Sequence, residues 1–247
     1  MIKTLFSVNV NKFALIRNSR GNNQPDLLRI IENCIAYGAQ GITVHPRPDG
    51  RHILYSDLDQ IKAWLLTHAP KIEFNIEGYP SRDFLNKVIA VCPDQVTLVP
   101  DPPEALTSSN GWDLKKEAHS LRDIILELKA HAIRTSLFIN PSLAGIETLP
   151  HIQTDRVELY TFDYARQFND RPEMAIAPYR ELVVALKNLP VDINAGHDLN
   201  AENLSYFLKE LKVIKEVSIG HALVCDALDL GLKSAIKNYL ECFRKVS

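Results

Sequence analysis

The side chains best suited to chemistry in this sequence are two histidines and two arginines that follow a short apolar segment. Residues 41–44, Gly-Ile-Thr-Val, have the β-branched composition of a buried strand, and His45, Arg47, Arg51 and His52 come after it. Two intervening prolines stiffen this loop. Arginine offers a planar fork to phosphate, and histidine exchanges protons near neutral pH. The stretch therefore predicts a site for an anionic small molecule; the alternative is a solvated basic loop.

Two further turns place a glycine directly before a histidine. They are Asn194-Ala195-Gly196-His197 and Ile219-Gly220-His221-Ala222, and each follows an apolar run. Glycine lets backbone N–H groups approach a ligand closely, and a helix beginning just after such a turn favours a phosphate group. We therefore expect a phosphate site at these two turns.

Two glutamates at strand ends are candidates for proton transfer. Glu77 follows Asn75-Ile76, and Glu158 lies in the apolar run 156–160. A carboxyl group at the mouth of an apolar barrel has a raised pKa and can act as a base. The alternatives are a helix-dipole role for Glu77 and a structural ion pair for Glu158.

A polar cluster also surrounds the end of the first apolar run. Asn9, Arg17 and Arg20 are the types that clamp a phosphate, and the run 18–23 has the composition of a loop able to close over a ligand. A salt-bridged surface loop is the equal alternative.

The elements that must position these groups alternate regularly along the chain. Eight apolar runs precede helical patterns, at residues 5–10, 42–45, 72–76, 95–99, 135–139, 156–160, 191–195 and 217–219. The helical patterns cover residues 26–37, 56–67, 81–91, 114–131, 178–189 and 226–244, with shorter ones beginning at 142 and 201. Such alternation favours one (β/α)8 TIM barrel over residues 1–247, whose site lies at the C-terminal strand ends. A doubly wound open sheet is the runner-up, but its glycine-rich dinucleotide turn is not present.

Composition narrows the class of protein. The 247 residues carry a net charge of −2, which gives no electrostatic case for nucleic acid or an anionic membrane. No apolar run approaches the length of a membrane helix. The four cysteines are widely spaced and indicate reduced thiols in a cytoplasmic protein.

A metal site is a weaker interpretation of the same side chains. His45, His197, His221 and Glu77 are of types that bind zinc, but none forms an HxH or HExxH pair. Nearby arginines already supply positive charge, so we expect no metal.

At these residues the sequence resembles the pyridoxine 5′-phosphate synthase family of vitamin B6 biosynthesis, nearly from end to end. The motifs that carry the resemblance are Val8-Asn9, Arg17-Asn18-Ser19-Arg20-Gly21, Gly41 to His45, Arg51-His52-Ile53, Leu98-Val99-Pro100, Ser136 to Ile139, Asn194 to His197 and Ile219 to Ala222. The resemblance implies a (β/α)8 barrel with extra helical segments, usually a homo-octamer, without a metal or organic cofactor. It also implies condensation of two phosphorylated small molecules, 1-deoxy-D-xylulose 5-phosphate and 3-amino-2-oxopropyl phosphate, to pyridoxine 5′-phosphate, phosphate and water.

The resemblance also implies roles for individual residues. His45 and Glu77 would accept protons, His197 would donate one, and Glu158 would stabilise charge in the transition state. The aminoketone phosphate would be held by Asn9, Arg20, the His197–Asp198 turn, Gly220 and His221. The deoxyxylulose phosphate would be held by Arg47, His52 and Thr107.

Four positions depart from the family pattern. Asn11-Lys12 stands where Asp-His is common, Tyr160 where many members have His, and Asp198 where many have Gly. We expect Lys12 to meet a phosphate or carbonyl group. A carboxylate repels phosphate, so we expect Asp198 to contribute its backbone only, or to cap the following helix.

Two other functions stay open from the sequence. One is another phosphate-sugar barrel enzyme, an aldolase or isomerase, which would normally need a strand-end lysine or a metal. The other is a non-catalytic binder of phosphorylated ligands.

Overall fold

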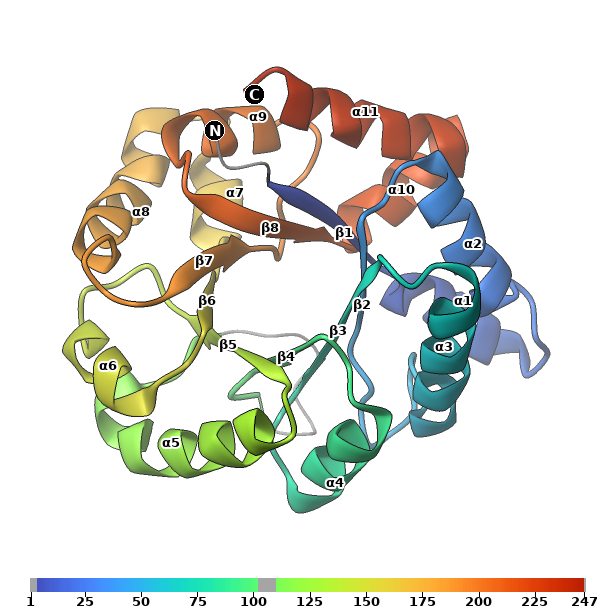
Figure 1. Cartoon of the computed structure of the whole chain (residues 1–247). Coiled ribbons are helices and arrows are strands. Elements are labelled where there is room, and N and C mark those ends of the chain that lie inside the picture. The colour runs from blue at the N-terminus through green and yellow to red at the C-terminus, as the bar shows by residue number, and fades with distance from the viewer. Residues whose placement is uncertain (1–3, 102–109, 247) are drawn as a thin grey trace.

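Eight parallel strands close into a barrel surrounded by helices (Figure 1). The computed structural model describes residues 4–101 and 110–246. Each strand pairs with the next in the chain, and the eighth pairs with the first. The (β/α)8 barrel predicted from the alternation of strands and helices is therefore confirmed.

The strands are short and occupy the predicted runs. They are β1 (Leu5–Asn9), β2 (Gly41–Val44), β3 (Glu73–Gly78), β4 (Gln95–Leu98), β5 (Arg134–Ile139), β6 (Arg156–Leu159), β7 (Asp192–Ala195) and β8 (Ile214–Ile219). The helices are α1 (Asn11–Arg20), α2 (Leu27–Tyr37), α3 (Tyr55–His68), α4 (Arg82–Val91), α5 (Leu114–Ala130), η1 (Ile146–Thr148), α6 (Leu149–Ile152), α7 (Phe162–Gln167), α8 (Pro172–Leu186), α9 (Leu204–Glu210), α10 (His221–Leu230) and α11 (Leu232–Arg244).

Side chains alternate along each strand between the helices and the barrel interior. The alternate residues Phe6, Val8, Phe74 and Ile76 are at most 1% exposed and belong to the apolar core. The residues between them are polar, and several join strands that are not neighbours. Thr97 on β4, for example, contacts Glu158 on β6. The barrel interior is therefore polar, whereas the main apolar core lies between the barrel and its helices.

A layer of charged and amide side chains fills the lower part of the barrel. We call it the floor network; its members are Glu73, Gln95, Arg134, Arg156, Asn194 and Glu216. Arg156 lies 3.0 Å from Glu216 and 3.3 Å from Glu73, so one guanidinium serves two carboxyl groups. The sequence patterns did not predict this network.

Helix ends agree with the sequence in part. Ser81 caps α4 by accepting a hydrogen bond from the Phe84 N–H, and Gly38 ends α2 with φ of 120°, as these residue types favour. Ser56, in contrast, lies inside the next helix and does not cap it. Leu54 stands at the start of α3, and the Asp57 carboxylate accepts its N–H at 2.8 Å.

Three predictions about the helices are corrected. Residues 11–20 form helix α1, so residues 18–20 of the run 18–23, expected to be a loop, are helical. The helix predicted over 178–189 begins earlier, at Pro172, so Pro178 lies inside α8, and the short helix α7 precedes it. The final predicted helix is two helices, because Gly231 has φ of 77° and separates α10 from α11.

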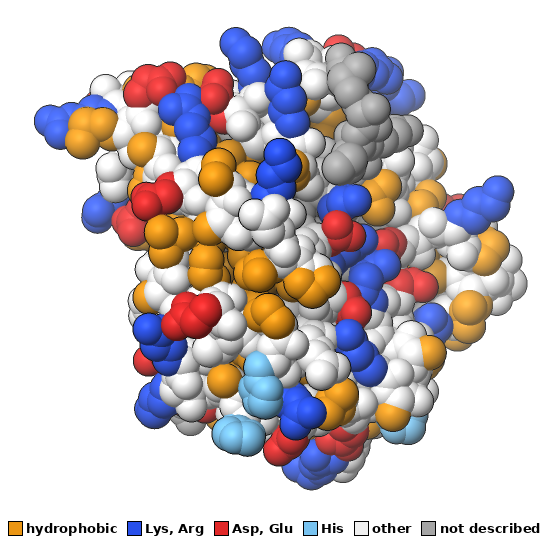
Figure 2. Space-filling model, turned by 60° about the vertical axis from the view of Figure 1, so that its left-hand side comes forward, with side chains coloured by type: hydrophobic (Ala, Val, Ile, Leu, Met, Phe, Trp, Pro, Cys, Tyr) orange, Lys and Arg blue, Asp and Glu red, His pale blue; other side chains and the backbone are white. Residues whose placement is uncertain are grey.

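The surface carries some apolar side chains of its own. Figure 2, which brings the side carrying α8 forward, shows hydrophobic side chains gathered near the middle of this face. Met174 and Val184 on α8 are 61% and 71% exposed. No helix in the described ranges has the length and apolar character needed to cross a bilayer. All four cysteines are unpaired, and two of them, Cys34 and Cys242, are buried.

Candidate active site

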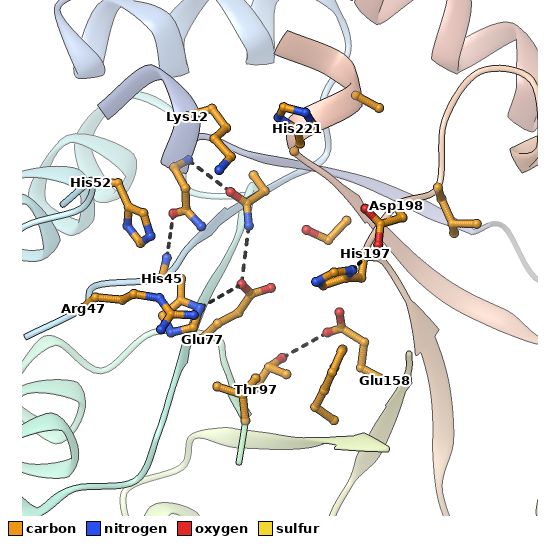
Figure 3. A pocket seen from close by; sticks show the side chains of 18 residues that line it. Lys12, His45, Arg47, His52, Glu77, Thr97, Glu158, His197, Asp198 and His221 are labelled. Carbon is orange, nitrogen blue, oxygen red and sulfur yellow. Dashed lines mark hydrogen bonds and ion pairs between the residues drawn. The ribbon is translucent and has the colours of Figure 1, made fainter. Parts of the chain in front are cut away.

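A cavity of about 280 Å³ opens at the C-terminal ends of the strands, which we call the mouth. Most of the predicted site residues line it (Figure 3): Asn9, Lys12, His45, Arg47, His52, Glu77, Glu158, His197, Asp198, Gly220 and His221. Thr107 lies outside the described residues. The structure thus brings together side chains from all parts of the chain at one rim, as the barrel topology predicts.

Arg20 is the described site residue of the prediction that does not line the cavity, because it lies at the far end of helix α1. A helix rises 1.5 Å per residue, so α1 carries Arg20 about 13 Å from Asn11 at its start. Arg20 is exposed there and is not one of the lining residues. Arg17, the other predicted phosphate clamp, is buried and forks the Asp57 carboxylate at 2.8 and 2.7 Å. The salt-bridged alternative is therefore correct for Arg17.

The ends of β1, β2 and β3 build one wall of the cavity. His45 Nδ1 lies 3.8 Å from Glu77 Oε2, and the Asn9 side-chain amide donates to the same oxygen at 3.4 Å. Asn11 accepts the His45 backbone N–H at 2.8 Å, so α1 fixes the end of β2. Asn11, one of the departures from the family pattern, therefore has a structural role.

Burial shifts the pKa values of His45 and Glu77, the two titratable groups of this wall, in opposite directions. It lowers the pKa of His45 well below the usual value, and the nearby charges of Arg47, His52 and Arg51 act in the same direction. Burial also raises the pKa of Glu77 well above its usual value, with Glu158 and Glu216 contributing repulsion. At neutral pH, His45 is therefore a neutral acceptor, while burial favours the protonated form of Glu77.

The loop after β2 adds two fixed hydrogen-bonding groups. His52 Nδ1 accepts the N–H of Ile53 at 3.0 Å, which leaves the proton of the neutral ring on Nε2. Burial, and then the charge of Arg47, lowers the pKa of His52 to about 4. Arg47 is 6% exposed and lies 3.7 Å from Asp101. This side of the cavity thus offers a neutral imidazole donor beside a guanidinium.

The opposite wall comes from β4, β6 and β7. Glu158 is 5% exposed, and the Thr97 hydroxyl lies 3.5 Å from its Oε2 atom. Burial raises the pKa of Glu158 to about 7. A Cβ atom on Gly196 would lie 2.7 Å from Glu158 Oε1, so a larger residue there would push against the carboxyl group.

The Asp198 side chain differs from the prediction. It was expected to contribute only backbone or to cap a helix, but its Oδ2 atom lies 2.6 Å from His197 Nδ1. Asn203 takes the position before α9. The reason is conformational: both His197 and Asp198 have positive φ, which turns the carboxylate back onto the imidazole.

The final turn forms an N–H-rich end of the cavity. Gly220 precedes α10, and Gly220, His221 and Ala222 all line the cavity. A Cβ atom on Gly220 would lie 3.1 Å from Asn9 Cβ, so only glycine fits without displacing that side chain. The start of α10 is therefore suited to an anionic group.

Several lining residues were not predicted as site residues. They are Asn11, Thr97, Val99, Phe138, Leu199, Ser218 and Ala222. Thr97 could have been identified, because it is a polar residue at an inward position of its strand; it is in register with Glu77 on β3. In the described part of the chain, no group of three or more His, Cys, Asp or Glu side chains is arranged to hold a metal.

Comparison with solved structures shows the same fold at low sequence identity. The tryptophan synthase complex from Pyrococcus furiosus matches with a TM-score of 0.66 and 16% identity, over 98% of this chain and 100% of that one. A 3-keto-L-gulonate-6-phosphate decarboxylase from Vibrio cholerae matches with a TM-score of 0.65 and 10% identity, over 99% of both chains. These likenesses support the barrel architecture.

Comparison of sequences is more specific. A pyridoxine 5′-phosphate synthase from Parabacteroides distasonis is 49% identical over 97% of this chain and 98% of its own length. The protein of the same name from Cytophaga hutchinsonii is 48% identical over 98% of this chain and 100% of its own length. The family described as "Pyridoxal phosphate biosynthesis protein PdxJ" matches residues 6–245. The chain therefore belongs to the PdxJ family of pyridoxal phosphate biosynthesis proteins.

Proposed function

We propose that the mouth cavity carries out the pyridoxine 5′-phosphate synthase reaction. 1-Deoxy-D-xylulose 5-phosphate condenses with 3-amino-2-oxopropyl phosphate, giving pyridoxine 5′-phosphate, inorganic phosphate and water. The observation that carries the proposal is the pairing, in one cavity, of two proton-exchanging walls with two separate anion-binding ends.

The two ends of the cavity suit the two phosphorylated substrates. Arg47, His52 and Lys12 supply donors and positive charge for the deoxyxylulose phosphate. Gly220 and the start of α10 supply backbone N–H groups for the aminoketone phosphate, with Asn9 beside them. This assignment makes no use of Arg20, which lies outside the cavity.

The ring closure combines imine formation, an aldol-type carbon–carbon bond, loss of phosphate and loss of water. Each step moves a proton, which requires several groups around one space. His45 accepts a proton first because it is neutral at working pH. Glu77 begins protonated and becomes an acceptor after it has given that proton away.

On the facing wall, His197 donates a proton to a departing oxygen. Glu158 stabilises positive charge that develops on the substrate nitrogen. With a pKa of about 7, Glu158 changes charge near neutral pH and so responds to the substrate's own charge.

The test is incubation of the purified protein with both phosphorylated substrates. We expect fluorescent pyridoxine 5′-phosphate and one equivalent of inorganic phosphate, and neither when one substrate is omitted. Binding of both substrates without product would instead identify a non-catalytic phosphate-ligand binder. Borohydride trapping of a substrate on Lys12 would favour an aldolase.

We also propose that residues 1–247 act as one domain in a cytoplasmic homo-octamer. The exposed apolar side chains Met174 and Val184 support an assembly of several copies. Sedimentation of the purified protein tests this, since an octamer is eight times the 27.9 kDa mass of one chain.

A further inference from the structure

The turn after β7 holds two residues in an unusual backbone conformation. His197 has φ of 36° and Asp198 has φ of 61°, in the left-handed region that favours glycine. A residue other than glycine is disfavoured there by about 1 kcal/mol. The backbone conformation alone would therefore favour glycine at position 198, so there must be another reason for an aspartate at this position.

That reason is a short contact between the carboxylate and the imidazole. Asp198 Oδ2 lies 2.6 Å from His197 Nδ1, a distance typical of a charge-assisted hydrogen bond. With Nδ1 donating to Asp198, Nε2 is the ring nitrogen that exchanges a proton with the cavity. Figure 3 shows the two side chains together on the wall that faces His45 and Glu77.

Aromatic rings pack against the same imidazole, and a hydroxyl group contacts the backbone of its turn. The Tyr160 ring packs edge-on against His197 with centroids 4.9 Å apart, and the Phe138 ring lies at 6.1 Å. The Thr161 hydroxyl is within hydrogen-bonding reach of the carbonyl oxygens of Gly196 and His197. The ring is thus fixed in position as well as in tautomer.

Charged groups from neighbouring elements face this turn. Glu158 faces His197 from β6, Asp198 contacts it directly, and His221 approaches Asp198 from α10. The hydrogen bond from His197 lowers the pKa of Asp198, so this carboxylate is ionised at neutral pH. A charged carboxylate at this distance stabilises an imidazolium more than a neutral imidazole.

We propose that Asp198 is a positioning residue that keeps the His197 imidazole in the Nδ1–H form and holds it cationic until it donates its Nε2 proton. This rests on the proposed role of His197 as proton donor. In that step the Nε2–H bond breaks and an O–H bond forms on the departing oxygen. His197 is left neutral, still bonded to Asp198 through Nδ1, and recovers its proton from solvent.

Two substitutions distinguish the effect of the Asp198 carboxylate from the effect of the turn conformation. Asp198→Gly removes the side chain and suits the positive φ, so it is expected to fold with stability equal to or above that of the wild type. Asp198→Asn keeps an acceptor for Nδ1–H but removes the charge. In both variants, NMR titration of the His197 ring should show its imidazolium losing the proton about one pH unit lower than in the wild type.

The pH dependence of kcat should change together with the protonation of the His197 ring. We expect kcat at pH 8 to fall about tenfold in both variants, with the alkaline limb of the kcat profile displaced to lower pH by the same amount. KM for each substrate should change little. Nitrogen chemical shifts of the neutral ring should show the Nδ1–H form retained in Asp198→Asn and mixed with the Nε2–H form in Asp198→Gly.

Other results overturn the inference. If the His197 titration and the kcat profile match the wild type in both variants, Asp198 is only a turn residue. If KM rises while the pH profile stays in place, Asp198 acts on substrate binding. If the wild type makes no product, the proposed function fails, whereas the NMR titration still decides whether Asp198 controls the ring.

Discussion

At the floor of the barrel, Arg156 lies within 3.3 Å of two carboxyl groups, and the Asn194 amide also donates to Glu216 at 3.0 Å. At the mouth, the two carboxyl groups sit differently. Glu77 has His45 as its only salt-bridge partner in the described part of the chain, and Glu158 has none there. Both regions are buried inside one barrel and contain similar residue types.

The difference shows how one interior can hold both structural and reactive charges. Carboxyl groups that share an arginine and amide donors are satisfied, and breaking such a cluster costs stability. At the mouth, burial raises the pKa values of Glu77 and Glu158, and no arginine among the described residues is bonded to either, whereas at the floor burial raises the pKa of Glu216 to about 8 and the charge of Arg156 opposes it. The carboxyl groups at the mouth are ready to exchange protons with a substrate.

Removing a proton-exchanging group at the mouth should have the largest effect. His45→Ala and Glu77→Gln are each expected to lower kcat by about 10³-fold or more, because each removes a group that moves a proton. Thermal unfolding should stay close to that of the wild type, since neither residue belongs to the floor network. Steady-state turnover of both substrates measures the loss, and retained turnover in both variants would contradict these roles.

At the floor, a substitution should lower stability and leave turnover largely intact. Arg156→Met leaves Glu73 and Glu216 without their shared cation, so the free energy of unfolding should fall by about 3 kcal/mol. Below its unfolding temperature the variant should keep most of the wild-type kcat. Urea unfolding measures the change.

Arg134→Met is the matched control for the floor. This guanidinium also contacts Glu73, but its side chain is 31% exposed, so water can replace it and the loss should be smaller. Full stability of Arg156→Met combined with lost turnover would mean that the floor takes part in the chemistry.

The mouth was predictable from the sequence and the floor was not, for a topological reason. His45, Glu77 and His197 each follow an apolar run, and parallel strands bring all such ends to one rim. Glu73, Arg134 and Arg156 stand at strand beginnings, where a charged residue is typical of the surface. Only closure of the barrel reveals that they face one another inside it.

Local conformation explains the other differences. Residues 11–20 contain polar and charged side chains that suit a loop as well as a helix, and the Arg17–Asp57 pair depends on a contact 40 residues away. The direction of the Asp198 side chain depends on two consecutive positive φ angles, which no spacing pattern predicts. The residue types were therefore predictable, but these partners were not.

The pH dependence of the free energy of unfolding should show whether Glu158 binds a proton near neutral pH. Glu158 has a pKa of about 7 in the folded chain against an ordinary 4.5, so between these values the folded state binds more protons than the unfolded one. The free energy of unfolding therefore falls as pH rises from about 4.5 through 7. Glu158→Gln should make that slope shallower by about 1 kcal/mol per pH unit.

Denaturant unfolding at pH 5, 6, 7 and 8 measures the slope. The control is Glu32→Gln, which changes an exposed carboxylate on α2 and should leave the slope as in the wild type. Equal slopes for wild type and Glu158→Gln would mean that Glu158 is ionised throughout this pH range.

The smallest expected effect concerns the single hydroxyl group beside Glu158. Thr97 donates toward Glu158 Oε2 at 3.5 Å and lowers the pKa of that carboxyl group, in opposition to burial. Thr97→Val should therefore raise the pKa of Glu158 by about half a unit, which extends the falling part of the stability curve to higher pH.

Ser136→Ala provides the control on the neighbouring strand. Ser136 is in register with Thr97, and its hydroxyl oxygen is buried without a hydrogen-bond partner among the described residues. Its removal should leave the upper end of the stability curve where it is. If both variants move the curve equally, the polarity of the barrel interior as a whole sets the protonation of Glu158. A shift in Thr97→Val alone would mean that one donor tunes a mouth carboxyl group, as Arg156 does more strongly at the floor.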